Sequence, residues 1–337
     1  MTDSPTTGAE RILAIENAVK QCVVGQDDVV RETVACVLAG GHALLEGSPG
    51  LGKTLLVKSV AAACGLKFSR IQFTPDLLPA DITGTDIVRE GPEGRRFEFQ
   101  EGPLFGNIVL ADEINRATPR TQSALIEAMA EQQVSTGREQ RKLPHPFAVL
   151  ATQNPVEMEG TFPLPEAQLD RFLMKVLVPA PDEDALVTIF QRTKDAAPPL
   201  PEPALAEDAI RGLLLEVRSV AIADPLVRQV ARVVRATNPD AQSATDSARR
   251  NLRLGASPRA GEALCRVARV SALREGRGYV TAADLAWALR PTLRHRLLPS
   301  FEAEARGLTG DTLVADILHD LPSLPPEVEA ILAAVDR

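Results

Sequence analysis

Residues 47–54 read Gly47-Ser48-Pro49-Gly50-Leu51-Gly52-Lys53-Thr54, which matches the pattern G-x-x-x-x-G-K-T. An apolar run at 43–45 precedes this stretch, and an apolar, alanine-rich run follows it from Leu55. The loop is therefore expected to join a buried strand to a helix N-terminus. Its glycines let main-chain N–H groups turn toward phosphate oxygens, and the helix N-terminus adds partial positive charge. Lys53 can reach the outer phosphates, and the Thr54 hydroxyl can bind Mg²⁺.

The composition of the 337 residues suggests two domains, or one large domain with a satellite. Hydrophobic residues make up 45% and aromatic residues only 4%, so the core is expected to be aliphatic. The net charge of −8 disfavours a dedicated duplex-DNA binder. Between positions 211 and 296, however, about 16 arginines face about 7 acidic residues and no lysine. This region is either a solvated helical surface or a face that meets phosphates or acidic neighbours.

The spacing of the four cysteines indicates whether the protein works in a reducing or an oxidising compartment. Cys22, Cys36, Cys64 and Cys265 form no C-x-x-C pair, and each lies in an apolar stretch of helical pattern. Buried free thiols are expected, which suits a reducing environment. No apolar N-terminal stretch resembles a signal peptide, and no run of about 18 apolar residues could span a bilayer. The sequence thus predicts a cytoplasmic protein without a membrane span.

Strands and helices alternate in the first half of the chain, and helices alone follow. Strands are expected near 42–46, 68–73, 107–111, 147–152 and 172–178. Helices are expected near 9–21, 27–39, 55–63, 118–132, 182–192, 205–219, 224–236, 257–275 and 282–290, with Pro291 ending the last. Gly- and Pro-rich stretches at 84–103 and 134–146 predict two hairpins, the second turning at Gly137.

This order predicts an α/β fold with a parallel sheet core and a helical lid. The expected division is a disordered N-terminus at 1–8, an α/β nucleotide-binding domain at 9–180, and a helical lid domain with a C-terminal tail at 181–337. The breaks at 179–181 and 198–203, both proline-rich, place the junction near 180.

The strand at 108–111 ends in two carboxylates, Asp112 and Glu113. Ligands of an open parallel sheet lie beyond the carboxyl ends of its strands. Asp112 is expected to hold Mg²⁺ through water, and Glu113 to polarise the attacking water as a base. An acidic exit from a strand without any ligand is the alternative.

Asn154 and Arg171 also lie at strand ends. Asn154 follows the strand at 147–152 and could orient water, or it could simply start a turn before Pro155. Arg171 precedes the last strand and could neutralise charge on a phosphoryl group bound by a neighbouring subunit. A surface ion pair of Arg171 with Asp170 or Glu166 explains it equally well.

Arg259 stands in the first turn of a helix that Ser257 caps and Pro258 begins. The helix dipole disfavours a cation there by a few tenths of a kcal/mol. An external anion would offset that cost, so Arg259 is interpreted as a lid arginine that touches the outer phosphate. Pairing with a nearby acid is the alternative.

These motifs, in this order, resemble those of the AAA+ ATPases and, within them, the MoxR family. The stretches that carry the resemblance are Gly47 to Thr54 (Walker A), Leu110 to Glu113 (Walker B), 114–122, Asn154 (sensor 1), 160–172 and Gly255 to Ala260 (sensor 2). It covers roughly residues 10–320. The run at 160–172 is the most specific to this family.

The resemblance implies a P-loop NTPase core that binds ATP and Mg²⁺ at the subunit interfaces of a homo-oligomer, commonly a hexamer. It implies that Arg171 acts in trans, with Arg116 and Arg120 as other candidates, and that Val24, Gly25 and Gln26 line the adenine side. It maps 84–103 to the helix-2 insert and 134–146 to the pre-sensor-1 insert. It also implies chaperone-like remodelling or maturation of partner proteins, often ones with a von Willebrand factor A domain.

Two other functions remain open on the sequence. A nucleotide-gated scaffold with little turnover would keep Lys53 and Thr54 but would not need Glu113, Asn154 and Arg259 together. A magnesium-chelatase-type motor subunit, or a nucleic-acid translocase, is the second. The stretch 134–146 is basic but holds no aromatic residue, and only Phe147 follows it, which disfavours stacking on bases.

Overall fold

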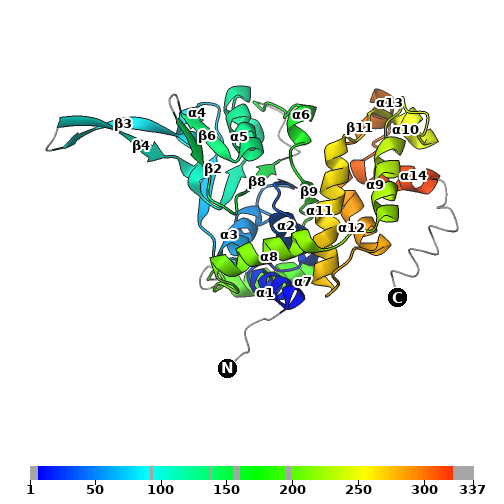
Figure 1. The fold of residues 1–337 in the computed structure, drawn as a ribbon, viewed down its shortest axis with the longest axis horizontal. Coiled ribbons are helices and arrows are strands. Elements are labelled where there is room, and N and C mark those ends of the chain that lie inside the picture. Colours follow the sequence, from blue (N-terminus) through cyan, green and yellow to red (C-terminus); the bar gives the residue numbers. More distant parts are fainter. Residues whose placement is uncertain (1–6, 92–93, 137–138, 155–159, 195–198, 322–337) are drawn as a thin grey trace. The chain divides into compact units, whose positions relative to one another are not determined.

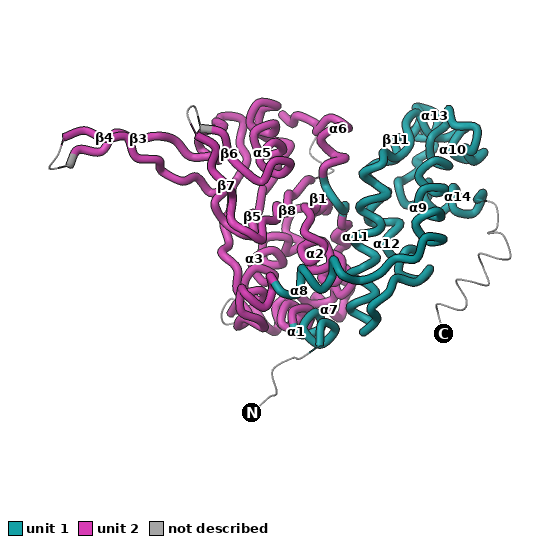
Figure 2. Tube along the Cα trace, in the orientation of Figure 1, with its two compact units in different colours: residues 1–14, 172–175, 212–337 teal, residues 15–171, 176–211 magenta. Residues whose placement is uncertain are grey.

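The computed structural model describes residues 7–91, 94–136, 139–154, 160–194 and 199–321. The chain forms two compact units (Figure 2). We call residues 15–171 and 176–211 the α/β unit, and residues 1–14, 172–175 and 212–337 the helical unit. The sequence placed a domain junction near 180, and residues 176–211 group with the α/β unit. Of the N-terminus expected to be disordered, 1–6 lie outside the described residues, and the first helix begins at Gly8.

A five-stranded sheet is the centre of the α/β unit. Its strands are β1 (Ala43–Glu46), β2 (Phe68–Gln72), β5 (Ile108–Asp112), β8 (Ala148–Gln153) and β9 (Met174–Leu177), in the order β2-β5-β8-β1-β9. The pairs β2–β5, β5–β8 and β1–β8 are parallel. β5 is buried along its whole length, as its uninterrupted apolar sequence predicted. All five expected strands are present.

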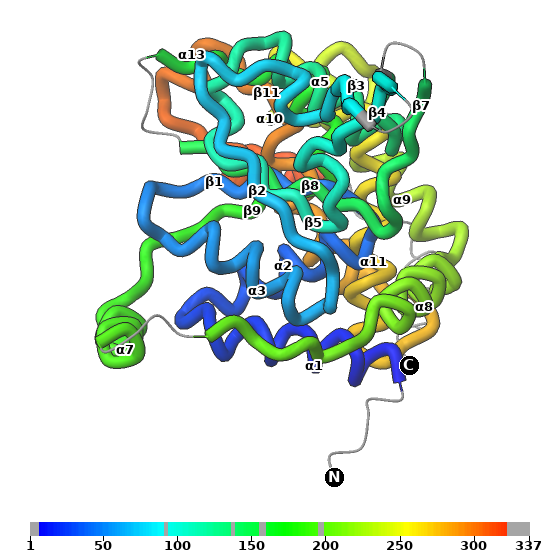
Figure 3. The backbone as a smooth tube through the Cα atoms, turned by 90° about the vertical axis from the view of Figure 1, so that its left-hand side faces the viewer, coloured from blue at the N-terminus to red at the C-terminus, as the bar shows by residue number. Residues whose placement is uncertain are grey.

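Helices of the α/β unit lie beside this sheet (Figures 1 and 3). They are α2 (Asp27–Leu38), α3 (Lys53–Ala63), α4 (Pro79–Thr83), α5 (Pro119–Glu131), α6 (Glu166–Leu169) and α7 (Glu183–Thr193), with the 3₁₀ turns η1 (Pro103–Phe105) and η2 (Ile114–Arg116). Helix α1 (Gly8–Lys20) is divided between the units, because its residues 8–14 group with the helical unit. Figures 1 and 3 show α2 and α3 beside the strands. The buried face of α3 is aliphatic, as the composition predicted.

Both expected hairpins are present in the α/β unit. The first is formed by β3 (Gly84–Gly91) and β4 (Gly94–Glu101), and the second by β6 (Gln133–Thr136) and β7 (Glu139–Lys142). Gly137, expected at the second turn, lies outside the described residues. The β3–β4 hairpin projects from the sheet in Figure 1 and points toward the viewer in Figure 3.

The helical unit contains most of the remaining elements. These are α8 (Glu207–Ser219), α9 (Asp224–Ala236), α10 (Asp246–Asn251), α11 (Pro258–Arg274), α12 (Ala282–Leu293), α13 (Phe301–Ala305) and α14 (Gly310–Asp320), with the short pair β10 (Leu252–Leu254) and β11 (Leu298–Pro299). The sequence did not indicate α10, α13 or the β10–β11 pair, which are too short to show a period. None of the described helices is long and apolar enough to cross a membrane.

Pro291 does not end α12, contrary to expectation. The helix continues to Leu293, and the proline lies inside it. Pro291 and Leu293 are both buried, so the last turn is held by packing. The hydroxyl of Thr292 also donates to Ala288 O at 2.6 Å, next to the backbone bond that the proline cannot form.

The four cysteines are free thiols, as expected. Cys22, Cys36 and Cys64 are buried. Cys265 differs from the prediction because it is only half-buried, on α11. Burial raises the pKa of Cys64 to about 12, so this thiol is inert at neutral pH.

Candidate functional site

The loop between β1 and α3 has the backbone geometry of an anion cradle. Gly50 and Gly52 both have φ of 80°, in the left-handed region that favours glycine, and a Cβ at either position would point into open space. A Cβ at Gly47 would lie 2.6 Å from Val178 O, so only glycine fits there. Because α3 begins at Lys53, its first N–H groups face the same opening.

The ammonium group of Lys53 lies over the loop. It donates to Gly47 O at 2.7 Å and to Ser48 O at 2.8 Å. Burial lowers the pKa of Lys53 below its ordinary value, and the carboxylates of Asp112 and Glu113 oppose this shift. Lys53, Asp112 and Glu113 line one cleft, so their charges can act on one ligand.

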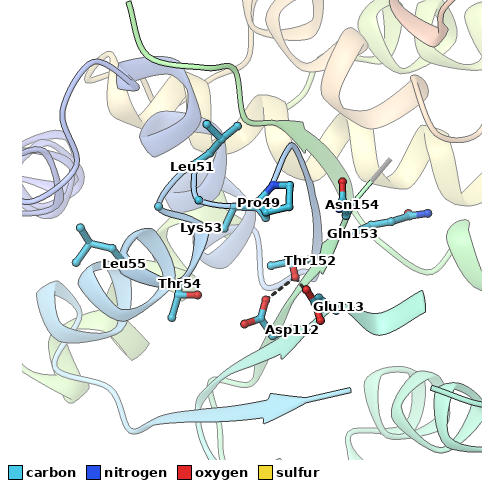
Figure 4. A pocket seen from close by; sticks show the side chains of 12 residues that line it. Pro49, Leu51, Lys53, Thr54, Leu55, Asp112, Glu113, Thr152, Gln153 and Asn154 are labelled. Carbon is cyan, nitrogen blue, oxygen red and sulfur yellow. Dashed lines mark hydrogen bonds between the residues drawn. The ribbon is translucent and has the colours of Figure 1, made fainter. Parts of the chain in front are cut away.

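Thr152 joins the two carboxylate residues at the end of β5. Its hydroxyl donates to Asp112 Oδ1 at 2.7 Å and accepts from the Glu113 N–H at 2.8 Å (Figure 4). The other carboxylate oxygen of Asp112, Oδ2, accepts from Arg70 Nη2 at 2.7 Å. These bonds fix the orientation of Asp112, which is buried.

Glu113 is held from its backbone and from its side chain. Its φ of 57° is unusual for a residue other than glycine. Its carboxylate oxygen Oε2 accepts from Gln72 Nε2 at 2.9 Å and from Arg116 Nη1 at 3.2 Å. Glu113 is one of the residues that line the cleft described next.

A cleft of about 410 Å³ brings most of the predicted site residues together. Its lining consists of Pro49, Gly50, Leu51, Gly52, Lys53, Thr54, Leu55, Asp112, Glu113, Thr152, Gln153 and Asn154 (Figure 4). The oxygen donors of Thr54 and Asp112 stand in the same cleft as Lys53. Mg²⁺ prefers one or two carboxylates or hydroxyls together with phosphate oxygens and water, so this donor set fits the metal.

A second, apolar cavity of about 270 Å³ adjoins the loop. It shares Gly50, Leu51, Gly52 and Leu55 with the first cleft, and its lining includes Val24 and Gln26, which the resemblance places on the adenine side. Helix α7 adds Leu186, Ile189 and Phe190, which the sequence had assigned to the helical domain. Its size and apolar walls suit a flat ring such as a nucleobase.

Gly25 lies against α7, next to the residues that line this cavity. It has φ of 71°, and a Cβ there would lie 2.5 Å from the Ala185 Cβ of α7. Next to it, Gln26 Nε2 donates to Leu51 O at 3.2 Å. Residues 24–26 thus connect α7 with the phosphate loop.

The four candidate arginines have different surroundings. Arg116 is bound to Glu113 of its own chain. Arg120 is exposed at the start of α5. Arg171 is half-buried, and among the described residues its guanidinium forms no ion pair, so the structure gives no support to the alternative explanation, a pair with Asp170 or Glu166.

Arg259 belongs to the helical unit, so its position relative to the cleft stays a prediction. It is exposed in the first turn of α11, where Ser257 caps the helix as expected. Its guanidinium makes no ion pair within the described ranges.

Sequence reasoning missed Arg70, Gln72 and Thr152. One signal was available for Gln72, which pairs in register with Asp112 on the neighbouring strand. Polar residues at the end of β2 therefore stand beside the carboxylates of β5. Finding that signal required the order of the strands, which local spacing does not give.

The loop after β1, the carboxylates at the end of β5 in the same parallel sheet, and the helical unit define an AAA-type ATPase. Residues 42–174 match the model of the "ATPase family associated with various cellular activities (AAA)", and residues 245–317 match the "AAA lid domain". Comparison with whole proteins narrows the class: the chain belongs to the MoxR family of AAA ATPases.

Similar proteins match the chain over most of its length. Chaperone MoxR1 of Mycobacterium tuberculosis is 41% identical over 99% of this chain and 93% of its own length. The uncharacterized protein YeaC of Bacillus subtilis is 41% identical over 90% of this chain and 92% of its own. The crystal structure of a protein from Cytophaga hutchinsonii, described as a "putative ATPase", matches this chain with a TM-score of 0.87 and 38% sequence identity. The match covers 94% of this chain and 96% of the other.

Proposed function

We propose that the protein hydrolyses ATP with the help of Mg²⁺ and uses the reaction to remodel or mature partner proteins as a chaperone does. One observation carries the catalytic part: a lysine, two carboxylates and an amide side chain line a single cleft at the end of the sheet, together with the phosphate loop. A protein that only binds the nucleotide needs the loop and Lys53. The second carboxylate, Glu113, is needed only if the bound nucleotide is hydrolysed.

The residues of the cleft have distinct proposed roles. The loop N–H groups and Lys53 would hold the outer phosphates, and Thr54 and Asp112 would hold the metal. When bound, Mg²⁺ neutralises charge between the phosphates. Glu113 accepts a proton from the attacking water, and Asn154 orients that water.

Hydrolysis further needs a positive charge next to the outer phosphate. We assign this role to Arg171 of an adjoining subunit in a ring, which is commonly hexameric in this family, and to Arg259 of the same chain. Arg116 suits the role less well because it is bound to Glu113 of its own chain. Arg120 remains the other candidate.

The partner is proposed to be a separate protein, possessing a von Willebrand factor A domain. The name Chaperone MoxR1 of a 41% identical relative supports the remodelling role. The projecting β3–β4 hairpin offers a surface on which such a partner could act. The four free thiols support a cytoplasmic location.

A Glu113→Gln variant tests the catalytic assignment. It keeps the shape of the site and removes only the base, so it should bind ATP normally and lose steady-state phosphate release by about 10²-fold or more. Chelation of Mg²⁺ should abolish release in the wild type. Undiminished hydrolysis by Glu113→Gln contradicts the role of Glu113, and negligible hydrolysis by the wild type supports the scaffold.

Mixing of variants tests the role in trans. Arg171→Ala subunits keep an intact cleft, and Lys53→Ala subunits keep an intact Arg171. A mixture should therefore recover part of the activity that each variant lacks alone. Mixtures no better than their parents count against Arg171.

A further inference from the structure

A groove of about 600 Å³ lies in the helical unit between α9 and α11, which run side by side (Figure 1). Gly261 of α11 allows the two helices to approach closely. A Cβ at this position would lie 3.3 Å from Val230 Cγ1 and 3.5 Å from Val234 Cγ2, both of α9. Every residue that lines the groove belongs to the helical unit, so the groove is a feature of this unit alone.

Helix α9 carries two apolar stripes, each with the spacing i, i+4, i+7 of one helical face. The first stripe is buried and consists of Leu226, Val230 and Val233. The second stripe lies one position later along the helix and lines the groove; it consists of Val227, Ala231 and Val234. In the described part of the chain this second stripe is left partly open, and Val227 is 44% exposed. A continuous apolar stripe beside a groove is typical of an interaction site.

The charged residues of the groove are mainly basic. Arg235, Arg266 and Arg269 line it, and Glu262 is the acidic residue among its lining. Arg235 is exposed at the end of α9, and no acidic side chain within the described ranges forms an ion pair with it. The groove therefore suits an amphipathic helix whose apolar face is flanked by carboxylates.

The sequence that follows α14 has this complementary pattern. Residues 322–337 lie outside the described part of the structure. Their larger apolar residues recur at i, i+3, i+4 and i+7, which are Val328, Ile331, Leu332 and Val335. On a helix with about 100° per residue, Glu327 and Asp336 fall on opposite sides of this face. The sequence thus predicts an acidic amphipathic helix.

The last described helix, α14, ends close to the C-terminal end of α9. Asp320 Oδ2 accepts from the Ser247 N–H at 2.9 Å. Two residues before Ser247, the Thr245 N–H donates to the carbonyl oxygen of Ala236, the last residue of α9, at 3.2 Å. Five extended residues span up to about 17 Å. Residues 322–326 are therefore long enough to lead the chain from α14 toward the groove.

We infer that residues 327–336 bind as a helix in the groove between α9 and α11 of the same chain. The apolar face of this segment packs on the second stripe of α9, and its flanking carboxylates pair with the arginines of the groove. Pro258, directly before Arg259, also lines the groove. The segment therefore binds beside the helical turn that carries the proposed lid arginine. This interaction goes beyond the proposed hydrolysis of ATP and does not depend on it.

The thiol of Cys265 reports on this interaction, because Cys265 is half-buried and lines the groove. A bound segment covers the thiol. Leu332→Glu in the full-length protein places a charge on the apolar face and should release the segment, so a disulfide reagent should modify Cys265 roughly ten-fold faster. Ala333→Glu is the matched control, since position 333 falls on the opposite face of the predicted helix, and it should leave the rate unchanged.

Two further variants test the groove itself. Val227→Glu places a carboxylate on the second stripe of α9 and should also accelerate the modification of Cys265. Leu215→Glu changes another exposed apolar residue of the same unit, 65% exposed on α8 and outside the groove, and should have no effect. A synthetic peptide of residues 322–337, added in excess to the Leu332→Glu protein, should restore the slow rate. The same peptide with the Leu332→Glu change should not.

The outcomes decide whether the segment binds and from which chain it comes. Faster modification in Leu332→Glu but not in Ala333→Glu, reversed by the peptide, supports the inference. Equal rates in the wild type and Leu332→Glu overturn it, as does a peptide that gives no protection. Leu332→Glu subunits are also mixed with Cys265→Ser subunits, whose intact segment can protect the other chain only in trans. Absence of protection supports binding within one chain, and protection overturns it in favour of a second copy.

None of these rates depends on turnover of ATP. The failure of this inference is therefore distinguishable from the failure of the proposed function, which phosphate release tests.

Discussion

Thr152 on β8 donates a hydrogen bond of 2.7 Å to Oδ1 of Asp112 on the neighbouring strand β5. The same hydroxyl accepts from the N–H of Glu113 at 2.8 Å. A single oxygen atom therefore sets the side chain of the proposed metal-binding residue and the backbone of the proposed base. Because that backbone has φ of 57°, the bond to Thr152 also stabilises a conformation that is unfavourable by itself.

Thr152→Val keeps the volume of the side chain and removes both hydrogen bonds. We expect turnover of ATP to fall by about 10²-fold, because a carboxylate misplaced by about 1 Å no longer aligns water. Binding of ATP should change by much less, since the phosphate loop is untouched. Thr152→Ser keeps the hydroxyl and should retain most of the activity. Steady-state phosphate release and nucleotide titration measure the two effects, and equal activity of the Val and Ser variants would rule out the bridge.

Phe190 of α7 lines the apolar cavity and is 65% exposed. Phe190→Ala should therefore weaken ATP binding by roughly ten-fold, about 1.4 kcal/mol, through lost contact with the base. The melting temperature should hardly change because the side chain supports no core. Phe301→Ala is the matched control, since Phe301 is 81% exposed on α13 in the helical unit. Equal ATP affinities of the two variants would contradict the assignment of this cavity.

Asp284 of α12 should make stability depend on acid pH. Burial alone would raise its pKa, but hydrogen bonds from Arg277, the Thr281 N–H and other donors hold the pKa below its ordinary value. A lowered pKa stabilises the fold above the unfolded value of about 3.9, and this contribution is lost as the pH falls through the folded value. Asp284→Asn should thus be less stable by about 2 kcal/mol above about pH 5. Denaturant unfolding should show this difference shrinking below about pH 4, and a difference independent of pH excludes the ionised form as its source.

Cys265 should be the thiol that reacts in the native protein. The other three cysteines are buried, and burial raises the pKa of Cys64 to about 12. Burial also raises the pKa of Cys265, with Arg269 opposing the shift, so the reaction should be slow at neutral pH and faster above it. A coloured disulfide reagent should modify about one thiol per native chain and all four after denaturation. Cys265→Ser should abolish the native reaction, and a persistent reaction would show that a buried thiol becomes accessible.

The sequence by itself determined what depends on neighbouring residues. The phosphate loop, the carboxylate pair after an apolar strand and the cap of α11 at Ser257 are contiguous patterns, and each was found where it was expected. Five apolar runs of strand length gave the sheet. These patterns can be identified in a single sequence because backbone preferences and hydrophobic periodicity act over a few residues.

Tertiary structure alone decided which distant residues meet. Arg70 reaches Asp112 across 42 positions, Thr152 reaches Asp112 across 40, and Arg296 reaches Phe172 across 124. Tertiary packing also brings α7 and the phosphate loop to the same cavity, and it allows α12 to continue beyond Pro291. Such contacts depend on the order of strands and on how helices pack, and a single sequence encodes neither in its local spacing. The groups that hold the proposed catalytic residues in place therefore became visible only in the folded chain.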